Sequence, residues 1–290
     1  MARISFDSHA KVNLHLNILR KRPDGFHDIS TIFHRISLAD RITLKTRSDD
    51  KIKIITSSRE IPKDHANLAF KSAKLLKDRY KIKKGVDIII KKNIPVSSGM
   101  AGGSSNAAGV LMGLNRLWKL GLAKKQLVFL ASLLGSDVAF FIYDCSFAKA
   151  EGRGQIIAPI RALKHFKLYL VIVVPKIAVS TRVIYRNWSQ LSGLTMPRYD
   201  DRLITLIKRD KDKSSLKKLL FNGLEPVTFK LYPKVRFLKE KMRLLGMDML
   251  LMSGSGPTVF AIASSKREAK AWAKLLKAQL ESSVFTAETV

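Results

Sequence analysis

The chain has 290 residues, of which 46% are hydrophobic, and this length favours two globular domains. Its formal net charge of +30 is typical of nucleic-acid-binding proteins. However, the basic residues are spread along the whole chain, without an aromatic RNA-binding motif or a zinc-ligand spacing. We therefore expect a solvated basic surface that attracts anionic substrates, and no specific nucleic-acid site.

The first part of the chain predicts strands followed by a helix. Residues 12–18 alternate between apolar and polar side chains, which predicts a half-buried strand. Its polar face carries Lys11, Asn13, His15 and Asn17. Arg22–Gly25 is a turn. Further strands are expected near residues 29–37, 41–46 and 51–56, a helix over Asn67–Arg79, and a strand over Val86–Lys91.

A loop rich in glycine and serine, Pro95–Ser105, connects this strand to an apolar helix. Gly99, Gly102 and Gly103 have no side chain, so the backbone can take positive φ values there and approach a ligand closely. The helix start adds N–H groups and the positive end of a dipole, so a phosphate-binding loop is predicted. The glycine spacing is neither that of a Walker A loop nor that of a dinucleotide fingerprint. The alternative is a serine N-cap on an ordinary helix.

The rest of the chain predicts helices and short strands in an α+β arrangement. A helix at about 124–134 leads into Gly135-Ser136-Asp137 and an apolar strand near Val138–Tyr143, followed by a tight turn at Glu151–Gly154. After a buried strand at Leu168–Val174 we expect amphipathic helices at about 180–191, 200–209, 213–221 and 232–245. Strands at Met249–Met252 and Thr258–Ala263, a helix at about 266–280 and a last short strand complete the prediction.

Three features indicate a cytoplasmic protein. The longest apolar run, Leu168–Val174, is far shorter than the ~20 residues of a transmembrane helix, and the N-terminal residues lack the apolar segment of a secretory signal. The single cysteine, Cys145, excludes an intrachain disulfide and suits a reducing compartment.

Two charged residues are candidates for phosphoryl-transfer chemistry. Asp137 is an acid in a short turn before an apolar run, where it could deprotonate an attacking hydroxyl; the alternative is an ordinary turn or N-cap aspartate. Lys11 lies on the same strand face as Asn13, so the two side chains are expected to share one cleft. Its charge could stabilise a developing negative charge, and the alternative is a surface lysine.

Two further segments are candidates for ligand contacts. Phe26 and His27 combine an aromatic ring with a hydrogen-bonding ring, which suits a planar heterocycle; the alternative is a structural histidine. The six histidines show no metal-ligand spacing, so we expect no protein-bound zinc. Ser253–Gly256 forms either an anion-binding nest or a plain hairpin turn.

These motifs, in this order, resemble those of the GHMP kinases, whose two glycine loops are similar to Pro95–Ser105 and Ser253–Pro257. The match is closer to the branch of the family that acts on a cytidine diphosphate-linked methylerythritol. The segments that carry this closer match are Ala10–Leu14, Arg22–His27, Gly135–Val138, Ala150–Gly154, Asn222–Pro226 and Met252–Phe260. Phe26, Ala101 and Ala139 depart from the usual Tyr, Gly and Pro, and none of these changes removes a reacting group.

The resemblance implies a two-domain α+β fold, with a ribosomal-protein-S5-like domain over residues 1–160 and a ferredoxin-like domain over residues 161–290. It implies ATP and Mg²⁺ as cofactors and phosphorylation of the C2 hydroxyl of that methylerythritol compound in isoprenoid biosynthesis. Lys11 and Asp137 would be the catalytic pair, and Ser105 is a candidate metal ligand. The implied ATP-binding residues are Asn67, Pro95, Val96, Ser97, Ser98, Gly99, Met100, Ala101, Gly102, Gly103, Ser104 and Ser105. The implied substrate-binding residues are Asn13, Phe26, His27, Tyr185, Ser253, Gly254, Ser255 and Gly256.

Two rival functions follow from the same sequence. Another GHMP kinase, such as a homoserine or mevalonate kinase, would share the glycine loop but would not need Gly25-Phe26-His27. A nucleic-acid-binding protein would account for the charge of +30 and for an S5-like fold.

Overall fold

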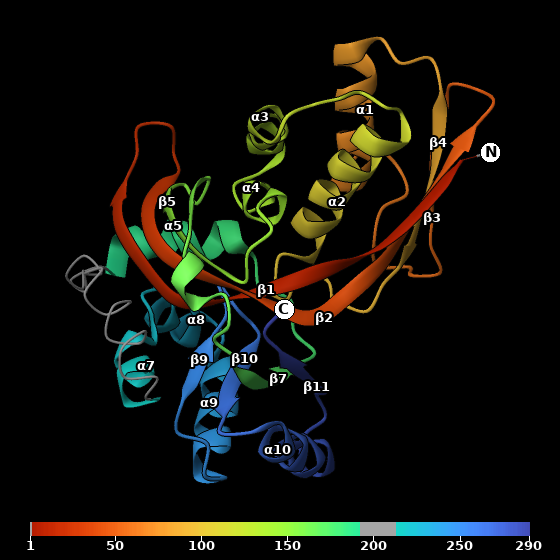
Figure 1. The fold of residues 1–290 in the computed structure, drawn as a ribbon. Helices are drawn as coiled ribbons and strands as arrows, with labels where there is room; N and C mark the ends of the chain where they lie inside the picture. The colour runs from red at the N-terminus through yellow and green to blue at the C-terminus, as the bar shows by residue number, and fades with distance from the viewer. Residues whose placement is uncertain (1, 192–212) are drawn as a thin grey trace. The chain divides into compact units, whose positions relative to one another are not determined.

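The computed structural model describes residues 2–191 and 213–290, which belong to two compact units (Figure 1). The first unit comprises residues 1–10, 39–96 and 101–144, and the second comprises residues 11–38, 97–100 and 145–290. Both units are discontinuous in sequence, because the long strands β1 (Arg3–Lys21) and β2 (His27–Arg47) contribute residues to each. The domain boundary at residue 160 stays a prediction.

The first unit combines a small sheet with helices. β4 (Gly85–Lys91) pairs in parallel with β3 (Ile52–Ile55) and antiparallel with residues 41–47 of β2. The helices are α1 (Leu68–Tyr80), α2 (Gly102–Leu117), α3 (Lys124–Leu134) and α4 (Val138–Ile142). Glycines let α2 pack closely: a Cβ at Gly109 would lie 2.5 Å from Phe6, and one at Gly113 would lie 2.5 Å from Leu44.

The second unit contains a four-stranded antiparallel sheet in the order β11-β7-β10-β9. These strands are β7 (Tyr169–Val174), β9 (Leu250–Met252), β10 (Val259–Ala263) and β11 (Ser283–Glu288). Two helices, α9 (Pro233–Leu244) and α10 (Lys266–Gln279), contact them, as Figure 1 shows. A βαββαβ chain order with this strand order is the ferredoxin-like arrangement, so the prediction for the C-terminal part is confirmed.

Further elements of the second unit flank the residues of β1 and β2. Residues 29–34 of β2 pair with β5 (Phe147–Gly152), which pairs with β6 (Ile156–Pro159). β8 (Phe221–Asn222) pairs in parallel with residues 15–16 of β1. The remaining elements are α5 (Thr181–Leu191), α7 (Lys213–Leu219), α8 (Glu225–Leu231) and a 3₁₀ turn at Arg161–Leu163.

Most predicted elements are present, with two corrections. The apolar run near residues 138–143 is the helix α4 rather than a strand, and all five of its residues are buried. A short apolar run does not distinguish a buried strand from a buried helix, which explains the error. The two strands predicted near 29–37 and 41–46 are one strand, β2. The helix predicted at 200–209 lies outside the described residues.

Across residues 2–191 and 213–290, no helix is both long enough and apolar enough to span a membrane.

Candidate functional site

The backbone of the glycine loop, residues 95–105, uses the conformational freedom of glycine at one of its three glycines. Gly99 has a left-handed conformation, with φ of 76°. Gly102 and Gly103 have no positive φ, because both lie in the first turn of α2. The other left-handed residues of the loop are Ser97, with φ of 53°, and Ala101, with φ of 54°.

The start of α2 is built without a capping side chain. Its N-cap is Ala101, which makes no side-chain cap hydrogen bond, so the alternative of a serine N-cap is wrong. A Cβ at Gly103 would meet only Leu68 Cδ1, at 3.9 Å, whereas a Cβ at Gly102 would lie 3.0 Å from Ile94 Cγ2. Gly103 is exposed and has room for a small group beside it, as a helix start that receives a phosphate requires.

A buried carboxylate fixes the chain on both sides of the glycine loop. Asp40 is fully buried, and its Oδ1 accepts hydrogen bonds from the backbone N–H groups of Asn93 and Ile94, both at 2.8 Å. Its Oδ2 accepts from Lys92 Nζ at 2.7 Å and from Asn106 Nδ2 at 3.0 Å. Burial lowers the pKa of Lys92, and the charge of Asp40 opposes this effect. Sequence reasoning missed Asp40, whose only signal is an acid within an apolar strand pattern.

The polar face of β1 forms a chain of hydrogen bonds. Lys11 Nζ donates to Asn13 Oδ1 at 2.7 Å, and Asn13 Nδ2 donates to Thr31 Oγ1 at 2.7 Å. The Thr31 hydroxyl donates to the carbonyl of His15 at 2.6 Å. The predicted meeting of the Lys11 and Asn13 side chains is therefore confirmed. Lys11 Nζ also lies 4.8 Å from the centroid of the Phe33 ring.

The prediction that this strand is half-buried is wrong, because its polar face is buried as well. Lys11 is 4% exposed and Asn13 is 2% exposed. Hydrogen bonds to side chains and carbonyls make this burial possible, since a buried polar group without a partner is strongly unfavourable. A lysine held in this way is not the surface lysine of the alternative interpretation.

Asp137 and Asn67 both occupy helix N-caps. Asp137 precedes α4, belongs to the first unit and is partly exposed, whereas Lys11 belongs to the second unit. Asn67 caps α1: its Oδ1 accepts from the N–H of Ala69 at 2.9 Å, and its Nδ2 donates to the carbonyl of Pro62 at 2.8 Å. The roles of Asp137 as a base and of Asn67 near an adenine stay predictions.

His27 lies in a buried aromatic cluster. Its ring centroid is 5.3 Å from that of Tyr185 and 5.5 Å from that of Trp188, whose ring it meets edge-on. Burial, and secondarily the charge of Lys21, lowers the pKa of His27, so the ring is neutral near pH 7 with one donor and one acceptor nitrogen. Sequence reasoning missed Trp188, although its spacing of three residues from Tyr185 places both on one helix face.

Phe26 lies in a different environment from its neighbour His27. Its side chain is 50% exposed, and the guanidinium carbon of Arg153 lies 4.7 Å from the ring centroid. Its backbone N–H donates to Asp24 Oδ1 at 3.1 Å, which shapes the turn. The structure therefore joins His27 to Tyr185, and pairs Phe26 with a cation instead.

The second glycine loop, Ser253–Gly256, contacts residues 97–100 of the first. Ser253 Oγ donates to the carbonyl of Gly99 at 3.0 Å, and a Cβ at Gly99 would lie only 2.3 Å from the carbonyl oxygen of Ser253. The hydroxyls of Ser255 and Thr181 are 2.8 Å apart. Sequence reasoning offered an anion-binding nest or a plain hairpin turn for this loop. The contacts do not distinguish these two interpretations, but they show that the loop supports Gly99 and Thr181.

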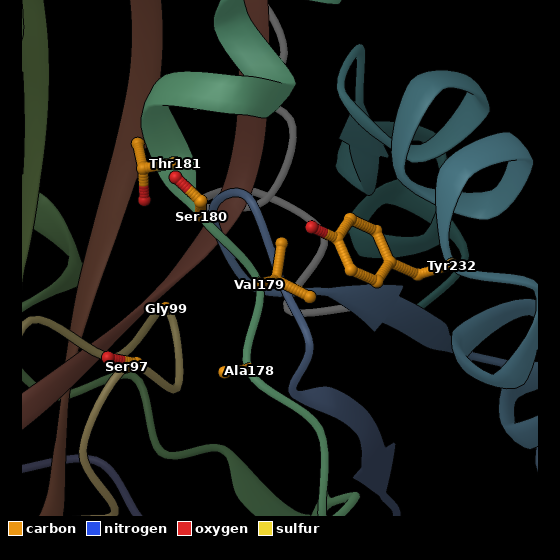
Figure 2. Close-up of a pocket in the computed structure, with 7 residues that line it drawn as sticks. All are labelled: Ser97, Gly99, Ala178, Val179, Ser180, Thr181 and Tyr232. Carbon is orange, nitrogen blue, oxygen red and sulfur yellow. The ribbon is translucent and has the colours of Figure 1, made fainter.

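A cavity of about 440 Å³ lies beside these contacts. Its lining combines backbone of the glycine loop with hydroxyl groups, as Figure 2 shows. The lining residues are Ser97, Gly99, Ala178, Val179, Ser180, Thr181 and Tyr232. The Tyr232 side chain extends toward Val179. Ser180, Thr181 and Tyr232 were missed by sequence reasoning, because no local pattern relates them to the loop.

The chain is similar to known GHMP kinases. The family models for the GHMP kinases N terminal domain and the GHMP kinases C terminal match residues 67–145 and 203–281. A 4-diphosphocytidyl-2-C-methyl-D-erythritol kinase of Geobacillus sp. (strain WCH70) is 47% identical over 90% of this chain and 88% of its own length. A crystal structure of 4-(cytidine 5'-diphospho)-2C-methyl-D-erythritol kinase has a TM-score of 0.79 and 31% identity, covering 98% of this chain and 99% of that one. Methanococcus jannaschii mevalonate kinase, at 14% identity and a TM-score of 0.71, covers 100% of this chain and 99% of its own and shares the fold alone.

Proposed function

The chain belongs to the GHMP kinases and, within them, to the 4-diphosphocytidyl-2-C-methyl-D-erythritol kinases, and we propose from this premise which of its residues bind and phosphorylate the acceptor. The enzyme is a small-molecule kinase that transfers the γ-phosphate of ATP to the C2 hydroxyl of 4-diphosphocytidyl-2-C-methyl-D-erythritol, a step of isoprenoid biosynthesis. The single cysteine supports a cytoplasmic location.

The observation that carries the proposal for ATP is the open start of α2. Ala101 provides no capping side chain, and a Cβ at Gly103 would meet only one side-chain atom, Leu68 Cδ1 at 3.9 Å. Phosphate oxygens bound there would accept hydrogen bonds from the first N–H groups of the helix. Asn67 would lie near the adenine.

In the proposed reaction, the carboxylate of Asp137 accepts the proton of the C2 hydroxyl. The freed oxygen attacks the γ-phosphorus, a new P–O bond forms, and the bond to the β–γ bridging oxygen breaks, so ADP leaves. The ammonium group of Lys11, which Asn13 holds at 2.7 Å, stabilises negative charge on the reacting oxygens.

Mg²⁺ would neutralise charge on the phosphates when bound. The described ranges contain no group of three or more His, Cys, Asp or Glu residues that could hold a metal. Mg²⁺ in kinases commonly uses only one or two protein ligands together with phosphate oxygens and water, so a cluster of three such side chains is not required. Ser105, whose hydroxyl lies 2.7 Å from that of Ser8, is the candidate ligand.

We propose that His27, with Tyr185, recognises the cytosine. A neutral imidazole that donates its proton to cytosine N3 would oppose the N3–H of uracil, and an unpaired buried polar group costs ~1–3 kcal/mol. The uridine analogue should therefore have a kcat/KM lower by about 10- to 100-fold.

The test compares kcat/KM for the cytidine substrate, its uridine analogue, homoserine and mevalonate, in the wild type and in His27→Ala. We expect His27→Ala to reduce the ratio of kcat/KM between the cytidine substrate and its uridine analogue, mainly because kcat/KM for the cytidine substrate decreases. Equal kcat/KM for the two bases in the wild type would exclude the proposed cytosine pocket. Turnover of homoserine or mevalonate alone would instead favour a homoserine or mevalonate kinase.

A further inference from the structure

The helices α8 and α9 separate the motif Asn222–Pro226 from the second glycine loop in sequence. The first residue of the motif nevertheless forms hydrogen bonds in and beside that loop. Asn222 is 3% exposed. Its Nδ2 donates to the carbonyls of Met252, at 2.7 Å, and Gly254, at 2.8 Å, and its Oδ1 accepts from the N–H of Leu224 at 2.9 Å. Both donors and the acceptor of the amide are therefore used, and two of the three bonds hold the loop.

Glu225, in the same motif, holds the strand that enters the loop. Its Oε1 accepts from the N–H of Met252 at 2.9 Å, and both of its oxygens accept from Lys239 Nζ at 2.7 Å. The Lys239–Glu225 pair is largely buried, with side chains 12% and 15% exposed. Side chains of this motif thus bond both the N–H and the carbonyl of Met252.

The loop that this motif holds contacts two residues that line the 440 Å³ cavity. Ser253 Oγ donates to the carbonyl of Gly99. The hydroxyl of Ser255 lies 2.8 Å from that of Thr181. Gly99 lies too close to the loop backbone to accept a Cβ and is hydrogen-bonded to Ser253, so we expect its position to depend on that of the loop.

We propose that Asn222 is a positioning residue of the kinase: its amide fixes the second glycine loop, and the loop in turn fixes Gly99, of the expected ATP-binding loop, and Thr181, which lines the same cavity. This inference rests on the proposed function. Only an amide can serve here, because the side chain must donate to two carbonyls and accept from one N–H. A carboxylate in its place would face the oxygens of Met252 and Gly254 without a proton to donate.

The isosteric variant Asn222→Asp should change KM in a pH-dependent way, which a purely structural role of Asn222 would not produce. Burial opposite two carbonyl oxygens raises the pKa of the introduced carboxyl group, and its protonated form regains one donor. We expect the KM for ATP and for the acceptor to rise by about 10- to 100-fold at pH 8, and to recover partly at pH 6. Asn222→Ala should raise the same KM values without the dependence on pH.

The matched control is Asn115→Asp, in the first unit. Asn115 Nδ2 donates to the carbonyl of Leu122 at 3.0 Å, and its Oδ1 accepts from the N–H of Leu122 at 2.9 Å, so the control removes a similar bond. It should lower the unfolding temperature and leave both KM values unchanged at either pH. Wild-type KM values in folded Asn222→Asp and Asn222→Ala would overturn the inference alone. Wild-type protein that binds no ATP in calorimetry would overturn it together with the proposed function.

Discussion

Replacing Gly103 with alanine should move stability and nucleotide affinity in opposite directions. Gly103 is the second residue of α2 and has no positive φ, and the nearest atom to an added Cβ is Leu68 Cδ1 at 3.9 Å. Alanine therefore fits the fold without strain. Because it restricts the unfolded chain, it should stabilise the native state by about 0.4–1 kcal/mol. For a domain of this size that corresponds to about 1–3 °C in unfolding temperature.

The same methyl group should weaken ATP binding. It would occupy the space in which the first N–H groups of α2 meet a phosphate, and a hydrogen bond to a charged group contributes about 1.5–3 kcal/mol. Losing one such bond reduces ATP affinity by about 10- to 100-fold, and Gly103→Val should reduce it further. Calorimetry with a non-hydrolysable ATP analogue measures the affinity, and thermal unfolding measures the stability.

Gly99→Ala provides the contrast, because this substitution should lower the stability of the native state. Its φ of 76° is unfavourable for alanine, by about 1–2 kcal/mol, and the added Cβ would lie 2.3 Å from the carbonyl oxygen of Ser253. A Gly103→Ala protein that unfolds at a higher temperature and binds ATP with wild-type affinity would refute the reasoning, since the phosphates would then lie elsewhere.

Three further predictions concern the base, the charge and the response to acid. Asp137→Asn should lower kcat by about 10²- to 10⁴-fold in steady-state assays with little change in ATP affinity, and near-normal turnover would exclude Asp137 as the base. Binding to RNA or DNA should be independent of sequence and should fall steeply between ~50 and ~200 mM salt; selective binding at physiological salt in a gel-shift assay would contradict the expectation of no specific site. Burial lowers the pKa of His34 to about 3, below the ~6.5 of an unfolded histidine, so the unfolded chain binds the extra proton and stability should decrease as the pH falls from about 6.5 toward 3. In urea unfolding experiments, the free energy of unfolding of His34→Gln should decrease less over this pH range than that of the wild type. The same pH dependence in both proteins would show that His34 is not the group responsible.

Features that depend on local sequence could be predicted, and features that depend on distant contacts could not. The glycine loop and the helix after it follow from residue types at fixed spacing, and so does the alternation along β1. Asp40 could not be recognised, because its partners come from the exit of β4 and from α2, more than 50 residues away in sequence. The burial of Lys11 likewise depends on Thr31, on a neighbouring strand, through Asn13.

The three glycines of the first glycine loop have different structural reasons, which the sequence motif alone does not distinguish. Gly99 is required by its left-handed backbone and by the nearby carbonyl of Ser253, and Gly102 by its packing against Ile94. Gly103 has neither constraint, so the fold does not explain its lack of a side chain.

The acceptor must be selected by residues outside the shared fold. Mevalonate kinase has the same fold at low identity, so the fold cannot by itself decide between a small acid and a cytidine compound. Selection must come from particular side chains, and the cluster of His27, Tyr185 and Trp188 is the one that we propose for this role. Its rings present hydrogen-bonding and aromatic surfaces together, which a flat base can use and mevalonate cannot. Substrate choice in this chain is therefore expected to change with His27 and its ring partners, whereas ATP binding is expected to change with Gly103.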